Sequence, residues 1–147
     1  VIQMAKKNLK FDFKIDESIK EALSPEKLKE ARRNAVTAAG MAWADETKEI
    51  VREDDHIDTS LYINSIGYLT DIPAQDKTGK GSRTATQNDV VHELIEGADT
   101  TILLTGSGVS YAEILEKKYN IMARGLDRAS ERMDRVAQVQ IQKTLGL

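Results

Sequence analysis

Residues 24–53, SPEKLKEARRNAVTAAGMAWADETKEIVRE, carry the longest helical pattern in the chain and decide its fold. Ser24 can accept a hydrogen bond from a free amide at a helix start, and Pro25 suits the first helical position because it has no amide to satisfy. One stripe, spaced at helical period, holds small and apolar residues: Leu28, Ala31, Ala35, Ala38, Ala42, Thr47, Ile50 and Val51, with Ala39 and Trp43 beside it. Because alanine lets another element approach closely, we expect this helix to lie flat across a sheet.

The charged residues of the same stretch predict its solvent side. They are Lys27, Lys29, Arg32, Arg33, Asp45, Glu46, Lys48, Glu49 and Arg52. Opposite charges three or four positions apart can pair along a helix, so we expect a solvated outer face with ion pairs.

Strand patterns lie on both sides of the helix. Residues 9–16 alternate apolar and charged side chains, which predicts a strand with one buried face. Its expected inward residues are Leu9, Phe11, Phe13 and Ile15. Residues 66–72 also have a strand pattern, and residues 100–105, TTILLT, form a strongly β-like run. Residues 90–96 are ambiguous between strand and helix.

A long polar segment separates these strand candidates. Residues 73–89, PAQDKTGKGSRTATQND, contain no large apolar residue and predict a polar loop. Loops of this length in compact domains are usually functional or disordered. We expect this one to contact a partner through its charged residues, Asp76, Lys77, Lys80 and Arg83.

Two helices are predicted after the last strand. Ser110, Tyr111, Ala112 and Glu113 fit a capping box, in which the Ser110 hydroxyl and the Glu113 carboxylate each satisfy a free amide. A short helix over about residues 111–119 should follow, and then a C-terminal helix over about residues 121–145. The stripe of the C-terminal helix comprises Leu126, Ala129, Met133, Val136, Ala137 and Ile141. The order of elements predicts one α+β domain over residues 1–147, with a small mixed or antiparallel sheet, the long helix on one face and the C-terminal helix.

Composition excludes several classes of protein. The chain has 147 residues, 40% of them hydrophobic and 31% charged, and a net charge of −3. A nucleic-acid reader usually carries a basic excess, so tight duplex binding is not expected. The absence of cysteine excludes disulfides and thiolate chemistry and suits a reducing cytosol. No apolar run approaches the roughly 20 residues of a membrane span, and the N-terminus lacks the pattern of a secretory signal.

Candidate binding sites for small groups are weak in this sequence. His56 and His92 have acidic neighbours, but no metal-binding spacing such as HxH or HExxH occurs. Residues 78–82, TGKGS, have the composition of a phosphate loop without its order. The strand–Gly–Ser–Gly–helix passage at residues 100–113 lacks the third glycine of a dinucleotide fingerprint. We therefore expect no metal and no cofactor.

Catalytic candidates are equally sparse. Glu113 could pair with Glu116 or Asp58 as two carboxylates for acid–base hydrolysis, although any chain with 24 acidic residues offers such pairs. There is no GxSxG elbow. We expect a protein that is not an enzyme.

Two passages carry a resemblance. Asp58-Thr59-Ser60-Leu61, followed by Asn64-Ser65-Ile66, is similar to a D-T-G-x-L-x-x-S-I motif that follows a long helix. Tyr111, Ala112 and Glu116 are similar to a Y-A-x-x-x-E motif that follows a strand, and Glu113 occupies the first of its three variable positions. At this spacing they resemble the tail-completion (neck, or head–tail joining) family of long-tailed bacteriophages, over about residues 9–135. Ser60 stands where that family has glycine, and the leucine is displaced by one position.

The resemblance implies a role for each motif. Asp58 and Thr59 would bond backbone amides in a turn, with Leu61 and Ile66 tucked against the core. This turn would redirect the chain from the long helix into the sheet. The resemblance also implies a virion protein made in the bacterial host cytoplasm, at the phage neck or upper tail end, with tail-terminator-like proteins among its relatives.

The expected partners follow from the same resemblance. Subunits of this family form rings, typically of six copies, between connector and tail-tube proteins, and the polar loop could reach the next ring. DNA would pass through the channel without specific binding, which a mildly acidic protein favours. Two alternatives remain: a small non-enzymatic binding or regulatory module of the antitoxin or adaptor kind, and a hydrolase that uses an acidic pair.

Overall fold

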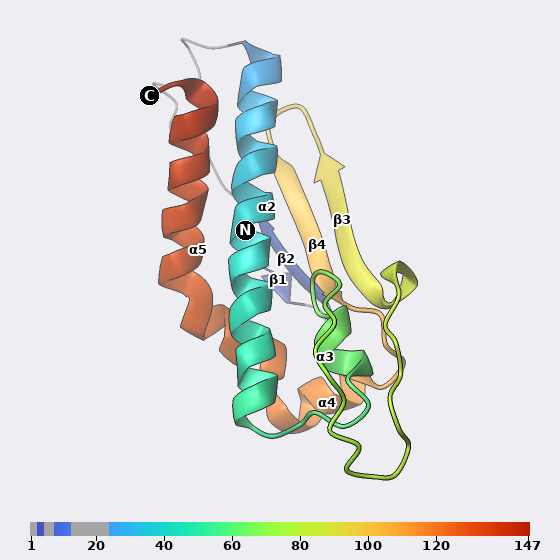
Figure 1. Cartoon of the computed structure of the whole chain (residues 1–147). Coiled ribbons are helices and arrows are strands. Elements are labelled where there is room, and N and C mark those ends of the chain that lie inside the picture. Colours follow the sequence, from blue (N-terminus) through green and yellow to red (C-terminus); the bar gives the residue numbers. More distant parts are fainter. Residues whose placement is uncertain (1–2, 5–7, 13–23) are drawn as a thin grey trace.

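The computed structural model describes residues 3–4, 8–12 and 24–147 of the chain (Figure 1). The principal elements, in chain order, are β1 (Gln3–Met4), β2 (Asn8–Asp12), α2 (Pro25–Glu53), α3 (Leu61–Ser65), β3 (Val90–Glu96), β4 (Thr101–Ser107), α4 (Ala112–Tyr119) and α5 (Ile121–Leu145). A short 3-10 turn, η1 (Gln87–Asp89), leads into β3. The predicted α+β class, with a long helix on an antiparallel sheet and a C-terminal helix, is confirmed.

The sheet has four strands in the order β1-β2-β4-β3, and every neighbouring pair is antiparallel. In β4, Thr101, Leu103 and Thr105 are buried, whereas the alternating Ile102 and Leu104 are half-buried. This period of two places one face of the strand against the core. Strand β3 lies at one edge of the sheet and pairs with β4 alone among the described strands.

Helix α2 crosses one face of the sheet, and α5 runs alongside α2 (Figure 1). The predicted cap is present, since the Ser24 hydroxyl accepts from the Lys27 amide at 3.2 Å. The small side chains of Ala31, Ala35 and Ala39 are fully buried. They let both neighbours lie close to the helix axis, as the alanine-rich stripe predicts.

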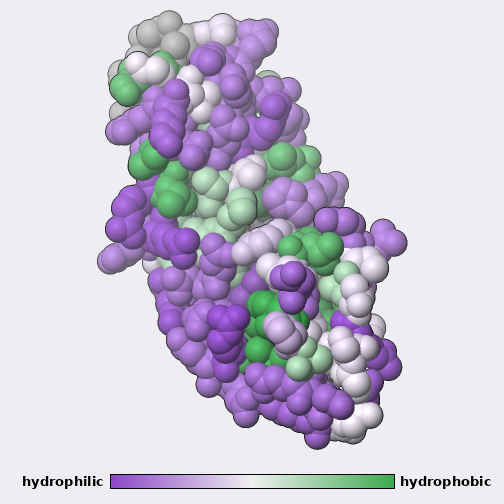
Figure 2. Space-filling model, viewed as in Figure 1, coloured by the Kyte–Doolittle hydropathy of each residue, from purple (hydrophilic) through white to green (hydrophobic). Residues whose placement is uncertain are grey.

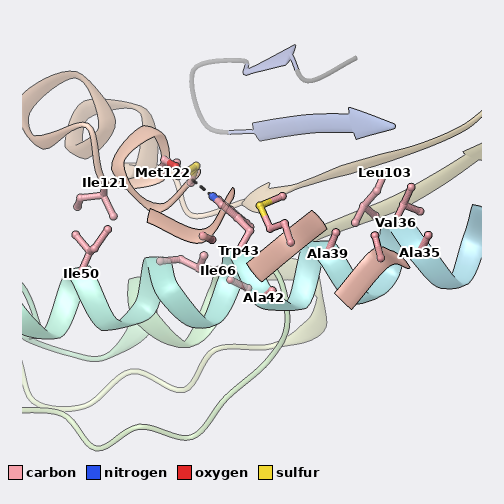
Figure 3. Packing of buried hydrophobic residues seen from close by; sticks show 14 of the residues in the cluster. Ala35, Val36, Ala39, Ala42, Trp43, Ile50, Ile66, Leu103, Ile121 and Met122 are labelled. Carbon is pink, nitrogen blue, oxygen red and sulfur yellow. Dashed lines mark hydrogen bonds between the residues drawn. The ribbon is translucent and has the colours of Figure 1, made fainter. Parts of the chain in front are cut away.

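The core centres on Trp43, which is fully buried between α2 and the start of α5 (Figure 3). Its indole N–H donates to the Met122 carbonyl at 3.1 Å. The N–H of a buried tryptophan needs such a partner, and here the acceptor is the first turn of α5. Ile50, Ile66 and Ile121 surround the same region (Figure 3).

Two charges expected on the solvent side of α2 are buried instead. The Lys48 ammonium lies under α3 and donates to the Ile63 carbonyl at 2.9 Å, the Tyr68 carbonyl at 2.9 Å and the Thr70 hydroxyl at 3.0 Å. Burial lowers the pKa of Lys48 to about 8, against an opposing effect of Asp45. Arg32 is 3% exposed and donates to the Ala98 carbonyl. Both predictions were wrong because each long side chain reaches carbonyls of another segment.

The other charges of α2 partly confirm the expected ion pairs. Arg52 pairs with Glu49 within the helix. Glu53 instead accepts two hydrogen bonds from Arg128 of α5, at 2.6 and 2.8 Å. These pairs are exposed, so each contributes little to stability.

Residues 66–72 form no strand, which corrects the sequence prediction. Gly67 adopts φ +70°, and the Tyr68 amide turns back to the Ile66 carbonyl at 2.7 Å. A Cβ at Gly67 would lie 2.7 Å from the Ala44 Cβ, so the chain needs glycine in order to pass this close to α2. A hydrogen bond from the Gly67 amide to the Gly106 carbonyl, at 2.9 Å, links the segment to the sheet.

The remaining strand predictions hold where they can be compared. Residues 8–12 are β2, residues 90–96 are resolved as β3, and β4 continues to Ser107, two residues past the expected end. Residues 13–16 of the first predicted strand, with Phe13 and Ile15, lie outside the described residues, as do the side-chain directions of Leu9 and Phe11.

The face seen in Figure 2 is mostly hydrophilic. Hydrophobic residues on it form separate patches. Any partner that meets this face therefore contacts a mixed surface with many charges.

The crossing of α2 and α5 depends on Gly125, and its replacement by alanine provides a test. A Cβ at this position would lie 2.0 Å from the Thr47 hydroxyl and 2.9 Å from its Cβ. We expect Gly125→Ala to destabilise the protein by about 1–3 kcal/mol, because the added methyl group overpacks the crossing. Chemical denaturation of both proteins measures this difference. In an unobstructed helix the same change would stabilise by about 1 kcal/mol, so a higher unfolding midpoint would contradict the crossing.

Candidate functional site: a pocket beneath the polar loop

The turn after α2 leads into a short helix rather than into the sheet. The Thr59 hydroxyl accepts from the Leu61 amide at 3.4 Å, as expected of a turn residue. Ser60 then adopts φ 72°, a left-handed conformation that glycine accepts more readily. Helix α3 follows, with Tyr62 and Ile63 buried. The predicted turn therefore exists, but its exit is helical.

The end of this motif is fixed to β4. The Ser65 hydroxyl lies 2.7 Å from the Ser107 hydroxyl and also donates to the Tyr62 carbonyl at 2.7 Å. Ile66 is fully buried and Leu61 partly so, in agreement with their expected roles. The motif thus joins the turn after α2 to the end of β4 through the Ser65 hydroxyl.

Asp58 anchors the polar loop. Its backbone carbonyl accepts from the Gln75 and Asp76 amides at 2.9 and 3.0 Å. Its carboxylate accepts from the Thr78 amide at 3.1 Å and from the Thr78 hydroxyl at 2.6 Å. The two hydrogen bonds to the carboxylate lower the pKa of Asp58, and the bond from the Thr78 hydroxyl has the larger effect. One residue of the first motif therefore fixes the path of a loop about 20 positions later.

The four charged loop residues have separate places. The Asp76 carboxylate accepts from the Gly81 amide at 2.7 Å, and Lys77 pairs with Asp55 at 2.6 Å. The Arg83 amide donates to the Thr59 carbonyl at 3.0 Å. Lys80 and Arg83 lie over the turn, whereas Asp76 and Lys77 shape and tether the loop.

The second motif forms α4 in a different register from the prediction. The helix begins at Ala112 with Tyr111 at the N-cap position, and the cap makes no side-chain hydrogen bond. Ser110 lies one residue earlier and is exposed, so its hydroxyl does not cap the helix as expected. The backbone closes the first turn instead, from the Leu115 amide to the Tyr111 carbonyl at 3.2 Å.

Glu116 caps the following helix. It is 7% exposed, and its carboxylate accepts from the Met122 amide at 2.7 Å and the Ala123 amide at 3.2 Å. These are free amides of the first turn of α5, where negative charge is favourable. The sequence motif marked Glu116 as important, but the amides that it binds belong to the next helix.

The two motifs and the loop meet at one pocket of about 380 Å³. The lining residues are His56, Ile57, Asp58, Thr59, Ser60, Tyr62, Ile63, Lys80, Arg83, Tyr111 and Leu115. They come from the turn between α2 and α3, from α3, from the polar loop, and from the start of α4. Segments separated by about 50 residues in the sequence therefore surround a single cavity.

Two hydroxyls in the lining are buried without a hydrogen-bond partner among the described residues. They belong to Ser60 and Tyr62, each 4% exposed. Burial raises the pKa of Tyr62 well above its usual range, and the nearby Glu116 carboxylate acts in the same direction. Sequence reasoning did not single out Tyr62, whose only signal was its place inside the first motif.

The metal-ligand and acid–base candidates from the sequence have other contacts in the structure. The His56 ring lies 4.1 Å from the Tyr119 ring, centre to centre. Within the described residues, no group of three or more histidines and carboxylates is placed to hold a metal ion. Glu116, one half of the acidic pair, is taken up by the amides of α5.

Comparison of the chain with protein-family models, curated proteins and solved structures found no significant match. Of the helices that the structure describes, none combines the length and the apolar character that crossing a membrane requires.

Glu116 and Ser110 offer a matched pair of substitutions. We expect Glu116→Ala to destabilise the protein by about 1–3 kcal/mol, because two amides at the start of α5 lose their acceptor. Ser110→Ala should change stability by less than about 0.5 kcal/mol, as for other exposed positions. Thermal and chemical unfolding measure both effects. A larger loss of stability in Ser110→Ala than in Glu116→Ala would support Ser110 as the cap and contradict the role of Glu116.

The anchor at Asp58 predicts a pH dependence. Because the folded pKa of Asp58 is lowered, its contribution to stability is present above the unfolded value of about 3.9 and is lost as pH falls through the folded pKa. We expect the Thr78 amide resonance to shift with a midpoint below about 3.9 in an NMR titration. Asp58→Asn keeps an acceptor but cannot titrate, so its Thr78 amide should lack this transition. A midpoint at or above the ordinary value would contradict the anchor.

Proposed function

We propose that this chain is a structural, non-enzymatic subunit of a ring at the neck or upper tail end of a long-tailed bacteriophage. In this role it joins tail to head, contacts the connector and tail-tube proteins, and lets DNA pass through the ring without specific binding. It is made in the host cytoplasm and incorporated into the virion. Six copies is the number typical of the family that its motifs resemble.

The observation that carries the proposal is the meeting of the two motifs in space. Asp58 to Ile66 and Tyr111 to Glu116 are similar to family motifs, and both contribute residues to one pocket. Ser65 bonds to Ser107, just before the second motif. Two short matches that assemble into one structural unit support a common origin better than two unconnected matches would.

The edge of the sheet supports ring formation. Strand β3 has a neighbour on one side only among the described strands, and Ile95 on it is 46% exposed. Unpaired strand edges are ready surfaces for pairing with another chain. A ring requires head-to-tail contacts that close, in which an edge of one subunit meets a different surface of the next.

Charge supports passage of DNA without retention. The net charge of −3 gives no excess of phosphate-binding side chains. Several arginines of α5 are also engaged by carboxylates, such as Arg128 with Glu53 and Glu46 and Arg132 with Asp45. A pore lined by such paired charges would hold DNA weakly.

Disruption of the gene in its parent genome tests the proposal. We expect electron microscopy of the lysate to show filled heads and separate tails, because the joint cannot form. Tails of irregular length would place the ring at the upper tail end. Supplying the full chain from a plasmid should restore infectious particles, which controls for effects on neighbouring genes.

A folded variant separates ring contacts from stability. Ile95→Lys should fail to restore particles, because it places a charge on the exposed strand edge, while keeping the parental unfolding temperature. Val139→Lys, at a 41% exposed position of α5, is the matched control and should restore them. Normal infectious particles from the disrupted genome would overturn the virion role and favour a small regulatory module.

A further inference from the structure

The pocket beneath the polar loop has features that the proposed ring does not explain. Of the four buried side-chain atoms without a partner among the described residues, two belong to residues that line this cavity: the Ser60 and Tyr62 hydroxyl oxygens. A buried polar group without a hydrogen bond destabilises the fold, because its lost contacts with water are not replaced. Two such groups in residues that line one cavity favour a bound molecule as the source of their missing partners.

Ser60 departs from ordinary local preferences twice. Its φ of 72° disfavours a residue with a side chain, and its hydroxyl is buried unpaired. Glycine would remove both penalties at this position. A serine that is unfavourable for the backbone and for the core is best explained by what its hydroxyl contacts in the cavity.

The charges of the lining favour a ligand with a single negative charge. Lys80 and Arg83 contribute two positive charges and Asp58 one negative charge, so these three lining residues together carry +1. Asp58 is bound to Thr78, so it stays beside the cavity. A doubly charged phosphate would leave excess negative charge next to this carboxylate, whereas a monoanion balances the lining.

The rest of the lining is apolar and aromatic. Ile57, Ile63 and Leu115 contribute aliphatic surface, and the rings of Tyr62 and Tyr111 lie 6.3 Å apart, centre to centre. The volume of about 380 Å³ falls in the range of small-molecule sites. Such a cavity fits an apolar or aromatic stem better than a fully hydrated ion.

We infer that this pocket binds a carboxylate on a short apolar or aromatic stem. The stem packs between Ile63, Leu115 and the tyrosine rings. Lys80 and Arg83 attract the negative charge, and the Ser60 and Tyr62 hydroxyls donate hydrogen bonds to the ligand. The carboxylate belongs either to a free organic acid or to an acidic side chain of a partner protein.

Matched probes test the charge requirement. NMR titration of the full chain with 3-phenylpropionate should shift the Ser60 and Tyr111 amide resonances. The neutral 3-phenylpropanamide, which has the same stem, should bind about tenfold more weakly. Equal binding of acid and amide would overturn the proposal, and so would the absence of binding by every carboxylate tested.

Substitutions of the two hydroxyl residues distinguish a ligand site from a merely structural one. Tyr62→Phe and Ser60→Gly should each weaken binding of 3-phenylpropionate by about tenfold. Neither should lower the unfolding temperature, because each removes an unpaired buried hydroxyl. If unfolding temperature falls and affinity stays at the parental value, these hydroxyls serve the fold and the proposal fails.

The cations have their own controls. Arg83→Gln and Lys80→Gln should each weaken binding of the acid several-fold and narrow its advantage over the amide. Arg135→Gln, on an exposed position of α5, removes the same charge away from the pocket and should leave affinity unchanged. An equal loss in all three variants would indicate a nonspecific effect of net charge and would overturn the site.

A second pair of probes identifies the source of the carboxylate. N-acetyl-Phe-Glu-amide and N-acetyl-Phe-Gln-amide present a side-chain carboxylate and its neutral counterpart on a peptide. Preference for the glutamate peptide supports an acidic side chain of a partner. Binding of 3-phenylpropionate with no binding of either peptide supports a free organic acid. These measurements use the isolated chain, so their result is independent of whether it forms a ring.

Discussion

The close crossing of α5 over α2 is the constraint on which the rest of the structure depends. Gly125 leaves no room for a side chain against Thr47, so the two helices lie close together at this point. This approach brings the Met122 carbonyl within reach of the Trp43 indole. The first turn of α5 is thereby fixed, and Glu116 of α4 binds its amides. Helix α4 reaches the pocket through this series of contacts.

The sequence predicted the elements whose signals are local. The serine and proline at the start of α2 and the periodic stripe of α5 act within one or two turns, and both helices have the expected bounds. The partner of each buried face is a tertiary property. Gly125 appears in the sequence as a small residue inside a helix, and nothing local indicates that Thr47 lies against it.

Tertiary contacts also explain the predictions that were wrong. Lys48 has the spacing of a surface charge, but it reaches three acceptors, one within α3 and two on the segment after it. Residues 66–72 have the composition of a strand, yet Asn64 bonds both the amide and the carbonyl of Ile72 at 2.8 and 2.9 Å and occupies the place of a neighbouring strand. Composition cannot distinguish these two partners, because both satisfy the same backbone groups.

The sequence marked the segments of the candidate site but not their assembly. Asp58 was expected to bond amides of its own turn, and its carboxylate instead holds Thr78 of the loop. That anchor places Lys80 and Arg83 over the cavity. The charge of the pocket therefore depends on the position of the loop. If the pocket binds a carboxylate as proposed, a partner that displaces the loop would also displace both cations and weaken that binding. By thermodynamic linkage, a ligand that binds the two cations must favour the anchored loop and oppose such a partner to the same extent.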